Sequence, residues 1–368
     1  MLPAQRIIIV RLSALGDVVL AQAAVFALRR FAPKAEITWV IEERFRTIAD
    51  AVPNIKVIPI EKPTSLSDYF RLRRLLRAES YDVLLAMQAS FRVNLLYGAI
   101  RARRKIGFDP RRARDLQQVF VSEMIQPRDE HLLDGFLQFV AKAGVPAVKT
   151  PAWPPALGLT AEEKWWQAQL RSLPAFEAKV SAPEPKKDRS GAARYVALQV
   201  GASKPERCWP AEYYGKLGAL LSARPDFNVV LVGGSSTEER AAVAALRAAA
   251  PAALDLTGQT NLAQLQLILA RAAVVISPDT AAVHIARAAN VPVVGLYAVA
   301  RPELSGPYRQ LGYTVNRYPE AVREIAGRDP SDAKKVDWHF RVHDPRAMGL
   351  ISVEDVWVAI ERAWKAGS

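Results

Sequence analysis

The chain has 368 residues, of which 50% are hydrophobic and 24% charged, a balance typical of soluble globular proteins. It contains a single cysteine, which excludes an intrachain disulfide, and no apolar run reaches the ~18–20 residues that span a bilayer. The formal net charge of +13 favours anionic partners such as phosphates, an acidic membrane surface or nucleic acid.

Strand and helix patterns alternate through the first half of the chain. Predicted strands cover 7–12, 37–41, 57–60 and 83–87, and predicted helices cover 18–31, 44–51, 67–78 and 134–143. Such alternation is typical of a parallel, doubly wound sheet. The stretch 150–191 then changes character, because proline, serine and lysine are dense on both sides of a helical segment at 161–173. We interpret it as a linker with a flexible loop.

A second alternating series follows the linker. Its predicted strands are 195–200, 228–232, 273–276 and 291–296, and its predicted helices are 213–223, 238–249, 262–270 and 280–289. We therefore expect two Rossmann-like α/β domains, 1–175 and 176–350, which face each other across a cleft where ligands bind. The remaining stretch, 351–368, is expected to form a helix that packs back on the first domain.

A carboxylate follows the first predicted strand. The β-branched run 7–10 ends at the turn 13–16, and Asp17 comes next, at the start of a helical pattern. Ligands of parallel α/β sheets bind just beyond the carboxyl ends of the strands. A carboxylate at this place is a candidate general base, and helix capping is the simpler alternative.

The segment ISPDTAAVHI, residues 276–285, joins another strand end to a helix start. The free N–H groups and the dipole of such a helix suit a phosphate or diphosphate. Ala281 and Ala282 leave room for a ligand near the backbone, and His284 lies about one turn after Thr280 on the same face. An ordinary capped helix with a packed histidine is the alternative.

Two cations lie in the turn of VGASKPERCWPAEYY, residues 200–214. Lys204 and Arg207 follow a predicted strand, where they can neutralise a leaving diphosphate. A surface loop anchored by a buried Trp209 explains the same pattern.

A third turn, in VLVGGSSTEER at 230–240, pairs two glycines with two acids. Gly233 and Gly234 allow the backbone to turn closely around a ligand, and Glu238 or Glu239 can accept hydrogen bonds from a ribose or base. The alternative is a plain helix start with favourable acids.

Several common site patterns are absent from the sequence. It contains no Gly-x-Gly-x-x-Gly after a strand, no phosphate-binding Walker motif, no His-Glu-x-x-His, no Cys-x-x-Cys and no Asp-x-Asp. The dinucleotide fingerprint and the usual zinc motifs are therefore excluded. We expect no metal site.

Basic residues cluster at two places in the first half. Seven bases and one acid lie within 101–114, and four arginines lie within 71–77. We predict that these arginines hold an anionic acceptor or an anionic membrane face. A solvated helix face followed by a loop is the alternative.

The order of these motifs resembles the bacterial heptosyltransferases, the lipopolysaccharide core glycosyltransferases of family 9. The resemblance rests on RLSALGD (11–17), Gly201 with RCWP (207–210), VGGS (232–235) and SPDTAAVH (277–284), and covers about residues 6–300 and the last helix. It implies the GT-B fold, a donor that is typically ADP-L-glycero-D-manno-heptose, and a Kdo–lipid A acceptor. It also implies inversion at the anomeric centre, no catalytic metal and no cofactor besides the nucleotide sugar.

The resemblance and the turns together give candidate site residues. Asp17 matches the proposed catalytic base of the family. The donor-binding candidates, in the second domain, are Ser203, Lys204, Arg207, Gly233, Gly234, Glu238, Asp279, Thr280, Ala281, Ala282 and His284. The acceptor-binding candidates, in the first domain, are Ser13, Gly16, Gln88, Arg103, Arg104, Arg111 and Arg112. Members of the family often have lysine where this chain has Arg207, and the segments 181–190 and 301–346 depart from the family pattern.

We therefore expect a monomeric cytoplasmic glycosyltransferase that binds a nucleotide sugar and an anionic lipid-linked saccharide, but no nucleic acid. Peripheral attachment to the inner face of the inner membrane stays open. One alternative is a nucleotide-sugar 2-epimerase of the same architecture, which would act on the donor alone. Another is a nucleic-acid-binding protein that uses the basic surface, although this leaves Asp17 unexplained.

Overall fold

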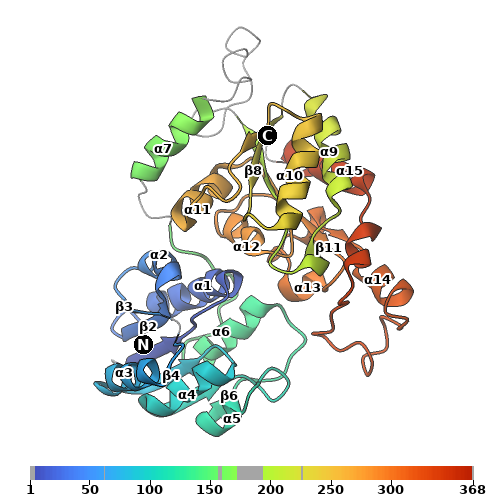
Figure 1. Cartoon of the computed structure of the whole chain (residues 1–368). Coiled ribbons are helices and arrows are strands. Elements are labelled where there is room, and N and C mark those ends of the chain that lie inside the picture. Colours follow the sequence, from blue (N-terminus) through green and yellow to red (C-terminus); the bar gives the residue numbers. More distant parts are fainter. Residues whose placement is uncertain (1–4, 62, 156–159, 172–193, 225–226, 367–368) are drawn as a thin grey trace. The chain divides into compact units, whose positions relative to one another are not determined.

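The computed structural model describes residues 5–61, 63–155, 160–171, 194–224 and 227–366. The chain divides into two compact units, Met1–Leu157 and Gly158–Ser368. Each unit contains its own six-stranded parallel sheet flanked by helices (Figure 1). The segment 181–190, which departs from the family pattern, lies outside the described residues.

The first unit is a doubly wound sheet with the strand order β3-β2-β1-β4-β5-β6. Its elements are β1 (Arg6–Val10), α1 (Leu15–Phe31), β2 (Glu36–Glu42), η1 (Glu43–Phe45), α2 (Arg46–Asp50), β3 (Lys56–Ile60), α3 (Leu66–Arg77), β4 (Ser80–Ala86), α4 (Phe91–Ala99), β5 (Arg101–Gly107), α5 (Gln117–Phe120), β6 (Glu123–Met124) and α6 (Leu132–Lys142). The β1 residues 7–10 are fully buried, as expected for a central strand covered on both faces. Leu72 and Leu76 of α3 and Leu96 of α4 join one core cluster over this sheet.

The second unit repeats this plan with the strand order β12-β11-β10-β7-β8-β9. Its elements are α7 (Thr160–Arg171), β7 (Tyr195–Gln199), η3 (Pro205–Arg207), α9 (Ala211–Ser222), β8 (Asn228–Val232), α10 (Thr237–Ala249), β9 (Leu254–Asp255), α11 (Leu262–Arg271), β10 (Val274–Pro278), α12 (Ala281–Ala288), β11 (Val293–Tyr297), α13 (Pro302–Ser305), η4 (Leu311–Tyr313), β12 (Val315–Asn316), α14 (Tyr318–Glu324), η5 (Pro345–Leu350) and α15 (Val353–Ala366). In each sheet the first strand of the unit lies beside the fourth strand of the unit. The strand order therefore reverses at β1/β4 in the first sheet and at β7/β10 in the second.

The division between the units lies at 157/158 rather than at the expected 175/176, because α7 packs within the second unit. Trp166 is 1% exposed and meets the ring of Tyr195 edge-on at 5.2 Å. Glu163 of α7 pairs with Arg271 of α11 at 3.3 Å. The boundary between the units therefore precedes α7.

The last helix also differs from the expectation. The buried face of α15, including Val356 and Ile360, belongs to the core cluster of the second sheet, and the ring of Trp364 lies 4.4 Å from that of Phe227. Arg194 Cζ lies over the same Trp364 ring, 4.1 Å from its centroid. α15 thus belongs to the core of the second domain.

The basic run 101–114 forms β5 and a turn, not a helix face with a loop. β5 pairs with β4 and β6 near the edge of the sheet. Arg101 and Arg103 are exposed, while Lys105 is partly buried and donates to Tyr97 O at 2.7 Å. No helix in the described parts of the chain is long and apolar enough to cross a membrane.

Candidate functional site

Asp17 lies in the first turn of α1, beyond the carboxyl end of β1. The N-cap of α1 is Ala14, so capping does not explain the carboxylate. Asp17 Oδ2 forms an ion pair with Arg11 Nη2, and the Asp17 side chain stays 31% exposed. The Arg11 side chain is 9% exposed and donates from Nη1 to Met87 O at 2.7 Å. A fixed guanidinium therefore orients a carboxylate that solvent and ligands can reach.

A pocket of about 350 Å³ opens at the same edge of the first sheet. Residues at the ends of β1, β2 and β4 line it, among them Ser13 and Gln88. Gln88 Oε1 accepts hydrogen bonds from the N–H groups of Leu12 at 2.8 Å and Ser13 at 3.2 Å, so it fixes the turn before α1. The structure thus brings two predicted acceptor residues to one pocket. Gly16 lies beside Asp17 in α1 and does not line it.

The arginines predicted to bind the acceptor are largely engaged inside the domain. Arg104 donates to both Glu123 oxygens, at 2.6 and 2.9 Å, and this hydrogen bonding lowers the pKa of Glu123. Arg112 pairs with Asp109 and Glu130, and its side chain is 9% exposed. Both arginines are therefore engaged in ion pairs within the first unit, although the Arg104 side chain stays 40% exposed.

The two remaining arginines of that group are more accessible. Arg111 pairs with Asp129 at 2.5 Å and its side chain is 45% exposed. Arg103 lies 3.8 Å from Asp82, with a side chain that is 86% exposed. Arg103 alone among the four keeps most of its side chain available to a partner.

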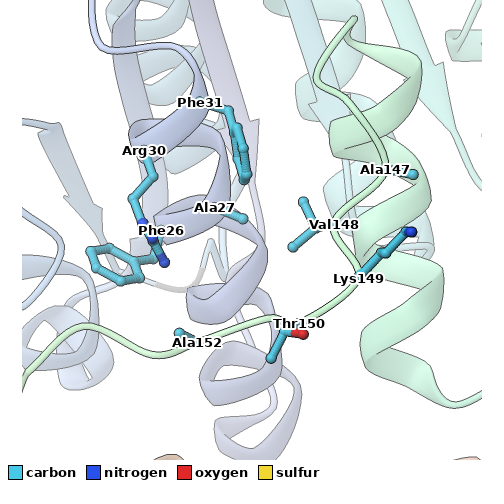
Figure 2. Close-up of a pocket in the computed structure, with 9 residues that line it drawn as sticks. All are labelled: Phe26, Ala27, Arg30, Phe31, Ala147, Val148, Lys149, Thr150 and Ala152. Atoms are coloured by element: carbon cyan, nitrogen blue, oxygen red, sulfur yellow. The ribbon is translucent and has the colours of Figure 1, made fainter.

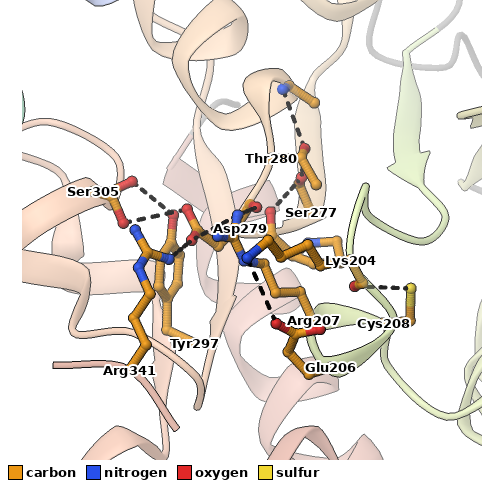
Figure 3. Close-up of polar contacts among 12 residues, drawn as sticks. Lys204, Glu206, Arg207, Cys208, Ser277, Asp279, Thr280, Tyr297, Ser305 and Arg341 are labelled. Carbon is orange, nitrogen blue, oxygen red and sulfur yellow. Dashed lines mark hydrogen bonds and ion pairs between the residues drawn. The ribbon is translucent and has the colours of Figure 1, made fainter. Parts of the chain in front are cut away.

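In the second unit, Asp279 is the centre of a compact polar cluster at the end of β10 (Figure 3). Its side chain is 11% exposed, and Oδ2 lies 3.5 Å from Arg207 Nη1 and 3.4 Å from Arg341 Nη1. Ser305 Oγ donates to Oδ1 at 3.2 Å. Arg207 comes from η3, whereas Ser305 and Arg341 come from the segment 301–346 that has no predicted role. This segment therefore completes the cluster.

The cluster carries an excess of positive charge. One carboxylate balances one of the two guanidinium groups, and the buried Nε of Arg207 has no hydrogen-bond partner among the described residues. Burial, and after it the charge of Asp279, raises the pKa of Tyr297 well above its usual value, so the neighbouring phenol stays neutral. An anion that accepts hydrogen bonds would complement this arrangement.

The start of α12 adjoins the cluster. Thr280 is the N-cap, and its Oγ1 accepts from Ala282 N at 3.2 Å and lies 2.9 Å from Ser277 Oγ. Ala281, the first residue of α12, is partly exposed. His284 is 5% exposed, so its ring lies inside the domain and not on the surface beside Thr280. A helix start and two arginines thus meet at one place, and each of them favours an anion.

The Gly233-Gly234 turn has a structural explanation. Glu239, 7% exposed, accepts from Gly234 N at 2.7 Å and from Ser236 N at 2.9 Å in the capping box of α10. A Cβ at Gly234 would lie 2.8 Å from Glu239 Oε2, and one at Gly201 would lie 2.4 Å from its Cγ. The glycines make room for this carboxylate, which leaves Glu238, exposed beside it, as the acid facing solvent.

The other predicted donor residues lie on the loop before η3. Ser203 is exposed, and Lys204, with a side chain 52% exposed, lies 4.0 Å from Glu206. Trp209 is buried and donates to Ile351 O at 3.0 Å, which anchors the loop as the alternative interpretation proposed. The loop is therefore both anchored and cationic.

Sequence reasoning missed three residues of these sites: Arg11, Ser305 and Arg341. Arg11 had a detectable signal, because it is a charged residue at the end of a buried β-branched strand, inside the motif that carries Asp17. Ser305 and Arg341 had none, since they lie in irregular segments that only the fold brings to Asp279.

The first unit has another pocket, away from the predicted site residues. A second pocket, of about 300 Å³, is lined by Phe26, Arg30 and Phe31 near the far end of α1 and by the chain at 147–152 (Figure 2). It contains none of the predicted site residues.

Within the described ranges, no group of three or more His, Cys, Asp or Glu is placed to hold a metal ion.

Comparison with known proteins gives a consistent result. The family model of glycosyltransferase family 9 (heptosyltransferase) matches residues 69–324. The chain is 30% identical over 350 residues to the lipopolysaccharide core heptosyltransferase OpsX of Haemophilus influenzae, covering 95% of this chain and 94% of that protein. It is 25% identical over 319 residues to the lipopolysaccharide heptosyltransferase 1 of Pseudomonas aeruginosa, covering 82% and 81%.

Solved structures share the fold. A family 9 glycosyltransferase from Veillonella parvula has a TM-score of 0.78 at 20% identity and covers 100% of this chain and 99% of its own. The E. coli heptosyltransferase WaaC with ADP has a TM-score of 0.69 at 20% identity and covers 97% and 99%. The expected class of two Rossmann-like, doubly wound domains in the GT-B architecture is confirmed. The match of the family model and the similarity to OpsX along nearly the whole chain show that this chain is a glycosyltransferase and belongs to glycosyltransferase family 9 (heptosyltransferase).

Proposed function

We propose that the protein transfers a heptose, or a related sugar, from an ADP-sugar to an inner-core lipopolysaccharide acceptor of the Kdo–lipid A type. The relatives are named as lipopolysaccharide heptosyltransferases, and WaaC structures contain ADP or ADP-2-deoxy-2-fluoro heptose. The observation that carries the proposal is the sharing of Asp279 by Arg207 and Arg341 at the start of α12.

The donor diphosphate is assigned to this cluster in the second domain. Arg207 and Arg341 supply donors and net positive charge, and Asp279 holds both guanidinium groups in place. As the bond between the anomeric carbon and the diphosphate oxygen breaks, negative charge grows on that oxygen. Preorganised cations stabilise such charge without reorganising during the reaction. They make a metal ion dispensable in the step.

The acceptor sugar is assigned to the pocket in the first domain, beside Ser13 and Gln88. Asp17 removes the proton from the acceptor hydroxyl while its oxygen bonds to the anomeric carbon and ADP leaves from the opposite face. One displacement of this kind inverts the anomeric centre. Arg11 acts as a positioning residue, because it fixes one Asp17 oxygen and leaves the side chain reachable.

Calorimetric titration with ADP, UDP and GDP tests the donor assignment. Tighter binding of ADP, together with a loss of about ten-fold or more in R207A, supports it, because a hydrogen bond to a charged group contributes about 1.5–3 kcal/mol. Preference for UDP or GDP, or unchanged affinity in R207A, contradicts it. R240A serves as the control, since Arg240 is exposed on α10 and, in the described part of the chain, its side chain bonds to Ser235 O and Thr237 Oγ1 at the start of its own helix.

A further inference from the structure

One helical layer of the first domain exposes an unusual amount of apolar surface. Ten large apolar side chains are exposed among the described residues, and seven of them lie on α3, on α4 or at α5. The most exposed are Leu66 (79%), Val119 (71%), Phe70 (69%) and Leu116 (60%). Large exposed apolar patches mark interaction sites, whereas single exposed residues need no explanation.

These side chains belong to one surface. α3 contacts α4, and α4 contacts α5, so the three helices lie side by side along the first domain (Figure 1). The opposite faces of α3 and α4 are buried on the sheet through Leu72, Leu76 and Leu96. The exposed residues therefore point outward from a layer whose inner side is already packed. We call this surface, formed by the outward sides of α3, α4 and α5, the α3–α5 face.

Buried polar side chains anchor the α4 and α5 part of the α3–α5 face. Asn94, fully buried, donates to Arg114 O at 3.0 Å and Asp115 O at 2.8 Å. Gln117, also fully buried, donates to Ala86 O at 3.0 Å. Between these anchors Leu116 has a φ of 64°, a conformation that leucine rarely adopts. The fold thus fixes an apolar side chain in solvent.

The same face is strongly basic. α3 and α4 carry five exposed arginines, four within 71–77 and Arg92, against one acid, Asp68. Asp68 caps α3 and pairs with Arg71 at 3.2 Å, and no ion pair is found for the other four among the described residues. A second copy of the chain would set these arginines against each other, whereas a negatively charged surface would neutralise them.

We propose that the α3–α5 face docks on an anionic lipid bilayer, with Phe70, Leu116 and Val119 entering the interface and the arginines contacting lipid phosphates. Interfacial helices combine apolar and basic residues in this way. The inference deepens the proposed function and rests on it for the lipid-linked acceptor. Phe91 and Arg92 belong to both the α3–α5 face and the lining of the first-domain pocket. Docking would therefore bring the pocket close to the plane in which such an acceptor lies.

Vesicle co-sedimentation of the full chain tests the docking. We expect binding to vesicles of phosphatidylethanolamine with phosphatidylglycerol, and little binding to phosphatidylcholine. The variant F70S/L116N/V119S should lose about ten-fold or more in partitioning, because each apolar side chain contributes free energy when it leaves water. Asparagine tolerates the backbone conformation of Leu116 well, so this variant should keep its fold. R73Q/R77Q should also weaken binding by about ten-fold at low salt.

The matched control is L220S/V358S, which removes two exposed apolar side chains from the second domain and should bind as the wild type does. Equal binding of wild type and F70S/L116N/V119S overturns the proposal. It is also overturned if no vesicle is bound and centrifugation shows a dimer that this variant dissociates. Binding of random-sequence DNA without binding of either kind of vesicle overturns it as well.

Transfer to a water-soluble, deacylated acceptor separates this proposal from the proposed function. F70S/L116N/V119S should keep wild-type kcat/KM on that acceptor and lose activity only on acceptor embedded in vesicles. Absence of transfer to every acceptor refutes the proposed function, and the vesicle measurement, which needs no acceptor, still decides the docking. Equal loss on both acceptors overturns the docking role.

Discussion

Arg341 Nη1 lies 3.4 Å from Asp279 Oδ2, although 62 residues separate the two in the chain. Arg207 reaches the same oxygen from a third segment, at 3.5 Å. One buried carboxylate thus holds two guanidinium groups in place. This relationship makes Asp279 a positioning residue for the groups that are proposed to meet the diphosphate.

Replacing Arg341 should therefore impair donor binding. We expect R341A to weaken ADP affinity by about ten- to a hundred-fold, because it removes a charge-assisted hydrogen bond donor. R341K should recover only part of the loss, since lysine lacks the fork of donors that holds Asp279. The control is R346A, because the Arg346 side chain is 75% exposed and its ion pair among the described residues is with Asp344. Calorimetry is the measurement, and equal affinities of R341A and R346A would exclude Arg341 from the donor site.

Removal of the proposed base should affect turnover and spare donor binding. D17N should lower kcat by about 10²–10⁴-fold, the usual contribution of a general base, with ADP affinity nearly unchanged. D50N, in the exposed pair with Arg46 on α2, is the control and should retain activity. Normal turnover of D17N would remove Asp17 from the mechanism.

Replacing Arg112 should destabilise the protein more than replacing Arg111. Arg112 pairs with the fully buried Asp109, so R112A should lower the free energy of unfolding by about 3 kcal/mol or more, because it leaves a buried charge unpaired. R111A, which breaks a more exposed pair, should cost about 1 kcal/mol or less. Urea unfolding measures both. A loss of acceptor binding in R112A without a loss of stability would show that Arg112 belongs to the acceptor site after all.

Acid should weaken the cap of α3. Hydrogen bonds from Thr64 and Ser65 lower the pKa of Asp68 from 3.8 to about 2. Its contribution to stability is therefore present above pH 3.8 and is lost as the pH falls toward 2. D68N, which does not titrate, should show a flatter decline of the urea midpoint over this range. Parallel declines in D68N and the wild type would refute this contribution.

Much of the fold could be predicted because periodicity reports burial. The strand β1, buried over residues 7–10, and the helices α1 and α10 lie within a few residues of their expected ranges. β5 was missed because its alternating pattern consists of arginines and lysine at a sheet edge, where little apolar surface is buried. The boundary at 157/158 was missed because the helical propensity of α7 does not show against which of the two sheets Trp166 packs.

The site could be predicted only where a strand end and a motif coincide. Asp17 and Asp279 each follow a buried strand, so topology alone places them at the ligand edge of a sheet. Arg341 lies in irregular chain, and its position depends on long-range packing that no local pattern records. The Gly233-Gly234 turn shows the reverse problem, since a pattern typical of ligand binding serves the buried Glu239.

Product analysis tests the central claim most directly. The protein is incubated with ADP-heptose and a Kdo–lipid A acceptor in the presence of a metal chelator, and the products are examined by mass spectrometry and NMR. The proposed function predicts one heptose on the acceptor for each ADP released, with the anomeric configuration inverted. Epimerisation or hydrolysis of the donor without transfer, or transfer with retention, would contradict it.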